Sequence, residues 1–412
     1  SILGQVCDHL CETTCIRTHL DEPLAIRHMK RFIMEQEEQP LIPLQERPRG
    51  KKVAIIGAGP AGLSAAQELA AAGFSVVIFE LHAYPGGMVG GAIPEYRLPQ
   101  AKIEQDMALL RGLGVEIRYG QAAGLDFTLD ELRADGFEAI FVAVGAQLAK
   151  RLGLPGEDAE GVIDALAFLR SVREGAPLAV GPRVGVIGAG DTAMDTVRSA
   201  LRVGAESASL IYRRTVDQMP ADPEEIHACR EEGVGIVELA KPAALHIEDG
   251  RLVGLVCTRT EYRGERDGAG RKIPFDVPES EFEIPLDTLV LAISQHSVLD
   301  FFGAQLPELT SAGYLEVDPF TFETSVPGIY AGGDVAGDGP SSIVKAAAEG
   351  KAVAAAIAVA LGEGAGEETA PEPLSRVDVH EMVKRRARRQ YRVPIEFAPT
   401  SDRGGFEQTV VG

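Results

Sequence analysis

Three glycines, Gly57, Gly59 and Gly62, follow the short apolar run Val53–Ile56 and precede a stretch, Leu63–Leu69, that is predicted to be helical. In such a G-x-G-x-x-G turn, the first glycine permits a tight bend, the second lets the backbone approach a pyrophosphate, and the third lets the helix pack closely on the strand. The start of the helix then presents free N–H groups to the phosphates. The spacing therefore predicts a dinucleotide site at the end of this strand.

An acidic residue stands at the end of the next predicted strand. Ser75–Phe79 leads into Glu80, eighteen residues after Gly62, and a carboxylate at this place accepts hydrogen bonds from ribose hydroxyls. A glycine-rich turn of some other α/β protein is the alternative, but the strand, the glycines, the helix and the acid occur here together. Gly86 and Gly87 follow in a loop that lets the chain approach a ligand closely.

A second turn of this kind, G-x-G-x-x-A, follows Val184–Ile187 and again opens a predicted helix. Its candidate binding residues are Gly188, Gly190, Asp191, Thr192 and Ala193. The next predicted strand, Ala208–Tyr212, ends in Arg213 and Arg214 instead of an acid, and arginine at this place can bind a ribose 2′-phosphate. Two intact glycine turns indicate two nucleotides that meet; the alternative is a duplicated fold in which one site is inactive.

The composition bounds the class of protein. The chain has 412 residues, 45% of them hydrophobic, which suits two or three domains with buried cores. A net charge of −21 argues against general binding to nucleic acid or to anionic membranes. Glu349 and Lys351 interrupt the alanine-rich run Ala346–Leu361, so we expect a buried helix there and no membrane span. Five cysteines and no signal-peptide pattern at the start favour a reducing compartment, the cytoplasm.

Three of those cysteines, Cys7, Cys11 and Cys15, lie four residues apart near the start of the chain. Thiols at this density suggest an iron–sulfur site, but a cluster ligated by cysteine alone needs four of them. The alternative is three reduced thiols on one face of a helix, because residues four apart share a face. The sequence thus leaves a [4Fe–4S] cluster open, and it indicates no other metal site.

Together these motifs resemble the glutamate synthase small-subunit family, which also includes flavin subunits of other NAD(P)-linked complexes. The resemblance covers about residues 6–362 and rests on these stretches: Cys7–Cys15, Pro23–Ile26, Gly57–Gly62, Gly86–Gly87, Ile93–Pro99, Gly188–Asp195, Tyr212–Arg214 and Gly328–Asp334. It implies an α/β fold with two Rossmann-like dinucleotide-binding domains, in which an NAD(P)-binding domain is inserted into an FAD-binding domain.

The implied organisation has five segments. A helical, cysteine-containing segment at residues 1–45 precedes the first part of the FAD domain at 50–165. The NAD(P) domain at 166–284 and the second part of the FAD domain at 285–362 come next. An extended tail at 363–412 ends the chain.

The resemblance also implies the binding residues. FAD would lie on the first glycine turn, with Asp334 bonded to its ribityl or pyrophosphate part, and the nicotinamide nucleotide on the second. In full, the implied cofactor-binding residues are Gly57, Gly59, Pro60, Ala61, Gly62, Glu80, Gly86, Gly87, Arg97, Gly145, Gly188, Gly190, Asp191, Thr192, Ala193, Arg213, Arg214, Gly333 and Asp334. The choice between NAD and NADP stays open, because an arginine at the ribose can also stack on adenine.

The function that follows is hydride transfer between NAD(P)(H) and FAD. Electrons would be exchanged with an iron–sulfur or ferredoxin-like subunit of a complex that also holds a larger catalytic subunit. Hydride passes directly between the two rings, so we name no catalytic side chain. No Cys-x-x-Cys occurs, so a disulfide reductase would lack its redox pair. A free-standing flavoenzyme acting on a small molecule and a scaffold subunit without activity are the alternatives.

We expect the amino-terminal segment to dock the partner subunit. Without a fourth thiol, its cysteines favour a docking role over a complete cluster. Ile26, Met29 and Ile33 recur at helical spacing, which predicts an apolar face on a helix of this segment. The segment would then lie between the flavin and the partner, where electrons must cross.

Overall fold

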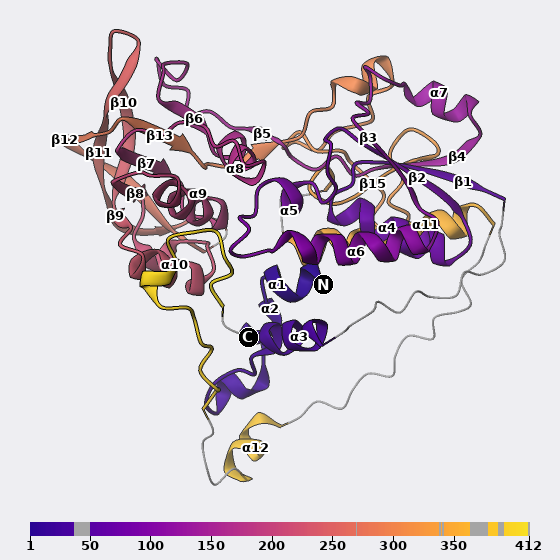
Figure 1. The fold of residues 1–412 in the computed structure, drawn as a ribbon, viewed down its shortest axis with the longest axis horizontal. Helices are drawn as coiled ribbons and strands as arrows, with labels where there is room; N and C mark the ends of the chain where they lie inside the picture. The colour runs from indigo at the N-terminus through magenta and orange to yellow at the C-terminus, as the bar shows by residue number, and fades with distance from the viewer. Residues whose placement is uncertain are drawn as a thin grey trace.

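Two parallel five-stranded sheets organise the chain, one on the right of Figure 1 and one on the left. The structure is a computed structural model and describes residues 1–36, 50–268, 270–337, 339, 342–362, 378–385 and 391–410. Helices pack on both sheets, and the amino-terminal helices lie beneath the junction of the two units. The α/β fold class predicted from the sequence is confirmed.

The first sheet has the strand order β15-β4-β1-β2-β3, with every neighbouring pair parallel. Its strands are β1 (Lys52–Ile56), β2 (Ser75–Glu80), β3 (Glu116–Tyr119), β4 (Phe137–Val142) and β15 (Ile329–Ala331). Alternate residues of β1 point to opposite faces, so that Val53 and Ile55 join one core and Ala54 and Ile56 another. The first core holds α4 (Pro60–Ala71), α6 (Gln100–Gly112) and α11 (Ile343–Ala360), and the second holds α7 (Leu129–Ala134).

The second sheet has the order β6-β13-β7-β8-β9 and is also parallel. Its strands are β6 (Val162–Asp164), β7 (Arg183–Ile187), β8 (Ser207–Ile211), β9 (Gly235–Val237) and β13 (Thr288–Leu291). One face is covered by α8 (Ala165–Arg173), α9 (Asp191–Arg202) and α10 (Pro223–Glu231). The other face packs, through Leu255 and Cys257, on an antiparallel sheet of β10 (Ala240–Glu248), β11 (Arg251–Arg266) and β12 (Lys272–Pro285).

The second unit is inserted into the first, because the chain returns to the first sheet when β15 pairs with β4. The two crossing segments pair with each other as β5 (Leu148–Ala149) and β14 (Gln295–His296). The domain boundaries predicted from the sequence, 165/166 and 284/285, assign the residues of β6 and β13 to the FAD domain. The structure corrects this assignment, because both strands lie in the second sheet. Such short apolar strands carry no local signal for which of two parallel sheets they join.

The amino-terminal segment forms α1 (Ile2–Val6), α2 (Leu10–Thr13), the 3-10 turn η1 (Ile16–His19) and α3 (Ile26–Glu35). Ile2 and Val6 belong to the core under the first sheet. The three cysteines do not share one helix, contrary to the alternative in the sequence analysis, because Cys7 ends α1 and Cys15 precedes η1. The break comes at His9, whose φ of 36° is left-handed.

The carboxy-terminal segment, which we define as residues 391–410, packs on the molecule. Residues 363–377 of the predicted tail lie outside the described residues, and α12 (Val379–Arg385) precedes this segment. Arg202 Nε donates to the carbonyl oxygen of Gly405 at 2.8 Å, and Arg403 pairs with Glu231 at 2.8 Å. Gln408 donates to Gln5 at 2.9 Å, so the segment joins the second unit to the amino-terminal helices.

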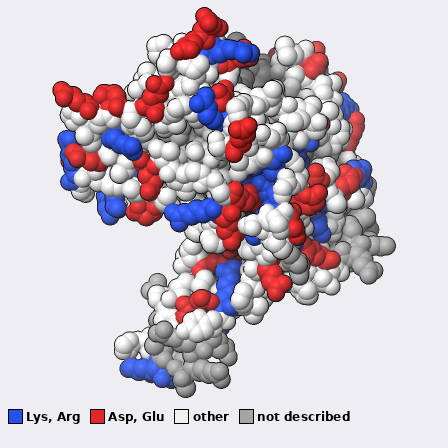
Figure 2. Space-filling view, turned by 60° about the vertical axis from the view of Figure 1, so that its left-hand side comes forward, with Lys and Arg blue, Asp and Glu red and all other residues white. Residues whose placement is uncertain are grey.

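The surface carries mixed charge. Figure 2 shows acidic and basic side chains interspersed over the face in view, in a chain with 61 Asp and Glu against 40 Lys and Arg. The alanine-rich helix α11 buries Val353, Ala354 and Ile357, as its interrupted sequence predicted. Within the described residues, no helix is both long and apolar enough to cross a membrane.

The crossing of α4 and α11 generates the first testable prediction. A Cβ at Gly350 would lie 2.1 Å from the carbonyl oxygen of Ala61, so Gly350→Val must force the helices apart. Overpacking typically costs about 1–3 kcal/mol, and we expect the free energy of unfolding to fall by at least that amount in urea titrations. Ala355→Val, at an exposed position of the same helix, is the control. Equal unfolding midpoints for the two variants would contradict the close crossing.

Candidate functional site

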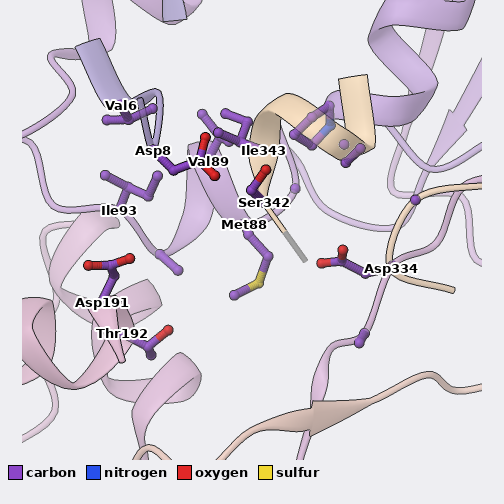
Figure 3. A pocket seen from close by; sticks show the side chains of 18 of the residues that line it. Val6, Asp8, Met88, Val89, Ile93, Asp191, Thr192, Asp334, Ser342 and Ile343 are labelled. Carbon is purple, nitrogen blue, oxygen red and sulfur yellow. The ribbon is translucent and has the colours of Figure 1, made fainter. Parts of the chain in front are cut away.

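A cavity of about 520 Å³ lies where the two units and the amino-terminal segment meet. In Figure 3, Asp191 and Thr192 of the second unit face Asp334 and Ser342 of the first across this space. The predicted site residues that line it are Gly57, Gly59, Pro60, Ala61, Glu80, Gly87, Arg97, Gly145, Asp191, Thr192, Gly333 and Asp334. One cavity thus brings residues of both glycine turns together.

The first glycine turn has three glycines with three different surroundings. Gly57 has φ +107°, and a Cβ there would lie 2.5 Å from the carbonyl oxygen of Ala143. A Cβ at Gly62 would lie 2.1 Å from the carbonyl oxygen of Gly57. At Gly59, in contrast, the nearest atom to such a Cβ is 4.0 Å away. Gly57 and Gly62 therefore hold strand, turn and helix together, whereas Gly59 leaves open the space that a pyrophosphate needs.

Glu80 is buried at the end of β2, beside this turn. Its carboxylate accepts the Ala58 N–H at 2.7 Å and the His82 N–H at 2.8 Å. These two bonds fix the orientation of the side chain, and the remaining lone pairs can accept ribose hydroxyls. Glu80 thus lies at the end of the second strand, as the sequence predicted, and lines the cavity.

Two further glycines, Gly87 and Gly333, bring the backbone close to the first turn. A Cβ at Gly87, where φ is +55°, would lie 3.1 Å from the Cα of Gly59. Gly333, where φ is +73°, abuts Ala61 in the same way at 3.0 Å and donates its N–H to Glu349 at 2.8 Å. Residue 334 follows directly, which explains how Asp334 reaches the cavity opposite the start of α4.

The second glycine turn repeats this geometry in the other unit. Gly188 has φ +147°, and a Cβ there would lie 2.3 Å from the carbonyl oxygen of Ala292. Gly190 has no atom within 4 Å of its Cβ position, and Ala193 is fully buried in the core. Asp191 begins α9 and accepts the Asp222 N–H at 3.0 Å. The turn is therefore tight where it meets the sheet and open where a second pyrophosphate would approach.

The two arginines after β8 have different surroundings. Arg214 is buried, donates from Nε to the carbonyl oxygen of Lys272 at 2.8 Å, and pairs with Asp267 at 3.0 Å. Arg213 is exposed. Of the two, Arg213 alone presents its guanidinium on the surface, as a ribose 2′-phosphate ligand must.

Arg97 lines the cavity, but its guanidinium is bound to the second unit. Nη1 donates to both carboxylate oxygens of Asp195, at 2.8 and 2.9 Å, and Nε lies 3.0 Å from a carboxylate oxygen of Glu225. Burial raises the pKa of the Asp195 carboxyl above its ordinary value, and the Arg97 guanidinium opposes that rise. Burial lowers the pKa of the Arg97 guanidinium, but the carboxylates of Asp195 and Glu225 raise it by more. The pKa therefore lies above its ordinary value, and Arg97 stays charged.

Sequence reasoning missed the contacts between the amino-terminal segment and the second unit. His9 Nε2 and Arg27 Nη1 each lie 2.8 Å from Oδ2 of Asp222, and Arg27 also pairs with Glu224. The bond from Asp222 raises the pKa of His9. Burial raises the pKa of Asp222, but His9 and Arg27 lower it below its ordinary value. The Asp-Pro sequence at residues 222–223 signals a helix start, yet nothing in the sequence indicates its partners.

The three amino-terminal cysteines are not brought together. Cys7 is buried and lines the cavity, with its Sγ 3.0 Å from the Nζ of Lys30, whereas Cys11 is exposed and Cys15 is half-buried. Among the described residues, no group of three Cys, His, Asp or Glu side chains is placed to hold a metal ion. The arrangement thus provides no cluster site from these three thiols.

Comparison with known proteins identifies the family. The family model described as pyridine nucleotide-disulphide oxidoreductase matches residues 51–350. The NADP(+)-dependent formate dehydrogenase subunit beta of Moorella thermoacetica is 40% identical over 400 residues, which cover 90% of this chain and 56% of that protein. The glutamate synthase [NADPH] small chain of Escherichia coli strain K12 is 35% identical over 379 residues, covering 86% and 79%. These relatives confirm the resemblance found in the sequence.

The fold is also that of a solved structure. Mycobacterium tuberculosis FprA in complex with NADPH superimposes with a TM-score of 0.62 at 19% identity, covering 82% of this chain and 89% of that one. The likeness confirms the architecture of two sheets with an insertion. The chain spans about half the length of the first curated relatives it matches.

The open space at Gly59 generates the second prediction. Gly59→Val should fold normally, because its φ of −76° suits valine and no atom crowds the Cβ, but the side chain should occupy the space of a pyrophosphate. We expect unchanged circular dichroism and less than about a tenth of one FAD per chain after reconstitution. Gly404→Val, at an exposed and uncrowded glycine outside the cavity, is the control. Full flavin content in Gly59→Val would contradict the site.

Proposed function

The chain belongs to the pyridine nucleotide-disulphide oxidoreductase family, and on this premise we propose that it binds FAD on the first glycine turn and NAD(P)(H) on the second. The observation that carries the proposal is the single cavity lined by both turns. The residues fit the two groups: Gly59 and Gly190 leave open space where pyrophosphates approach, and both precede helix N-termini. Family membership favours an oxidoreductase over the scaffold alternative.

The proposed division of work follows from the lining. Gly59, Gly87, Glu80 and Asp334 would hold FAD, and Asp191 and Thr192, which follow Gly190, the nicotinamide nucleotide. When bound, FAD supplies hydride exchange with the nicotinamide ring and passes electrons on singly. The chain itself binds and orients the two nucleotides.

Apolar side chains would keep water out of the space between the nucleotides. Met88, Val89 and Ile93 line the cavity, and Figure 3 shows Met88 between the residues of the two units. Exclusion of water protects a reactive donor from side reactions. No side-chain acid or base is required for a direct hydride transfer, and we propose none.

We further propose that the chain works as an electron-transfer subunit with an iron–sulfur partner. Its relatives are named as subunits of a formate dehydrogenase and a glutamate synthase, which supports a larger complex. The amino-terminal segment has one side in the cavity, through Val6 and Cys7. On α3, the apolar side chains Met29, Phe32 and Ile33 are 54, 61 and 62% exposed, which supports this helix as the docking surface.

All five cysteines are free thiols, which supports the cytoplasm as the compartment.

Nucleotide choice generates the third prediction. We expect NADPH to be preferred, because Arg213 is exposed at the ribose end of the second turn. Hydrogen bonds to charged groups contribute about 1.5–3 kcal/mol, so Arg213→Ala should lower the ratio of NADPH to NADH flavin-reduction rates by roughly 10- to 100-fold. Arg251→Ala, at an exposed arginine paired with Glu160, should leave the ratio unchanged. An unchanged ratio in Arg213→Ala would remove the assigned role.

The partner surface generates the fourth prediction. Deletion of residues 1–34 would remove Ile2 and Val6 from the core and break the ion pair between Arg27 and Asp222. Because such a deletion would also disturb the fold, a surface substitution is the cleaner test. Phe32→Asp should abolish association with the partner subunit but leave NADPH-dependent flavin reduction within about twofold of the wild type. Association is measured by co-purification from the native host with identification of the bound subunits.

Phe320→Asp is the matched control, because Phe320 is also an exposed phenylalanine, on the first unit. It should retain the partner. If Phe32→Asp captures the same subunits as the wild type in the same amounts, the helix α3 is not the docking surface.

A further inference from the structure

One loop of the first unit contacts three helices of the second, α8, α9 and α10. This junction loop, residues 93–98, connects α5 (Met88–Gly91) to α6. Its first residue, Ile93, lines the cavity. The loop therefore joins the cavity wall of one unit to the other unit.

The contacts of the junction loop run in both directions. Arg97 leaves the first unit and pairs with Asp195 on α9 and Glu225 on α10. In return, Arg173 at the end of α8 donates to the carbonyl oxygens of Ile93 and Leu98, at 3.3 and 2.8 Å. Three helices of the second unit thus hold one loop of the first.

Tyr96 adds a packing contact beside Arg97. The ring is 1% exposed, and the guanidinium carbons of Arg198 and Arg202, both on α9, lie 4.5 and 4.3 Å from its centroid. From the outer side, Thr409 of the carboxy-terminal segment donates its N–H to the Tyr96 carbonyl oxygen at 3.3 Å. The junction loop is therefore enclosed by the second unit and by the carboxy-terminal segment.

The position of Asp195 connects this junction to the second glycine turn. Asp195 lies on α9 one helical turn after Asp191, the first residue of that helix. A rigid bond between Arg97 and Asp195 consequently fixes the start of α9 relative to the cavity wall of the first unit. The two nucleotides must meet within about 3–3.5 Å for a direct transfer.

We propose that Arg97 is a positioning residue, which sets the orientation of the second glycine turn relative to the first through the two hydrogen bonds that its Nη1 donates to Asp195. This inference rests on the proposed function and goes beyond it, because it assigns a role in the hydride-transfer rate to a residue that does not touch the reacting atoms. A direct cofactor contact, which the sequence resemblance implied for Arg97, predicts a loss of FAD instead.

The test compares Arg97→Lys, Asp195→Asn and the double variant with the wild type, all as the full chain. Lysine keeps the charge but loses the planar fork, so it is gentler than an alanine that would leave Asp195 buried and unpaired. Arg183→Lys is the control, because Arg183 also donates two hydrogen bonds to one carboxylate, that of Asp287, from Nε and Nη2 at 2.8 Å each, but both residues are in the second unit.

Four quantities are measured: the FAD content per chain, the equilibrium Kd for NADPH, the limiting rate of flavin reduction in stopped flow, and hydrogen–deuterium exchange over residues 93–98 and 191–198. We expect Arg97→Lys and Asp195→Asn to reduce the limiting rate by roughly 10- to 100-fold, with FAD content and Kd within about twofold. Exchange should rise over both stretches. The double variant should lose no more than the worse single variant, because the two residues act as one unit.

Three outcomes would overturn the proposal: a limiting rate equal to that of Arg183→Lys, a loss of FAD with unchanged exchange, or additive effects in the double variant. If the wild type itself is not reduced by either nicotinamide nucleotide, the proposed function fails, and the exchange measurement then decides alone whether Arg97 holds the two units. Unchanged exchange in Arg97→Lys would overturn that role as well.

Discussion

The structure depends on backbone contacts that leave no room for a side chain on either side of α4. A Cβ at Gly62 would meet the Gly57 carbonyl oxygen, and one at Gly350 would meet that of Ala61, each at 2.1 Å. These contacts fix α4 between β1 and α11, and they fix where its free N–H groups begin. Gly333 is then held against Ala61. The wall of the cavity on this side is therefore set by backbone packing, and not by adaptable side chains.

The junction between the units is held differently, by buried charge. Arg97 of the first unit is paired with two carboxylates of the second, Asp195 and Glu225. Burying a guanidinium is costly unless its donors are satisfied, so only orientations that satisfy these bonds are stable. An apolar junction would tolerate sliding, whereas the planar guanidinium of Arg97, bonded to Asp195 through Nη1 and to Glu225 through Nε, defines both distance and angle. Directional bonds therefore suit a site that must align two bound groups.

The sequence predicted what depends on local pattern. The strand, glycine turn and helix from Val53 to Leu69 and the second turn at Gly188 follow from periodicity and glycine spacing, whereas the insertion was implied by the family resemblance. The pairings of Arg97, Arg214 and His9 did not follow, because each joins residues from 53 to 213 positions apart. The placement of β6 and β13 failed for the same reason, since a three- or four-residue apolar strand fits either sheet.

The amino-terminal segment shows why the boundaries of a site need not follow the boundaries of a domain. Its inner side supplies Val6 and Cys7 to the cavity, and its ion pair from Arg27 to Asp222 reaches the residue whose N–H is bonded to Asp191. Its outer side exposes Phe32 and Ile33. A protein bound to α3 would therefore be linked, through packed and paired residues, to the second glycine turn. Because contacts on such a segment are shared between the cavity and the surface, binding of a partner and occupancy of the cavity need not be independent.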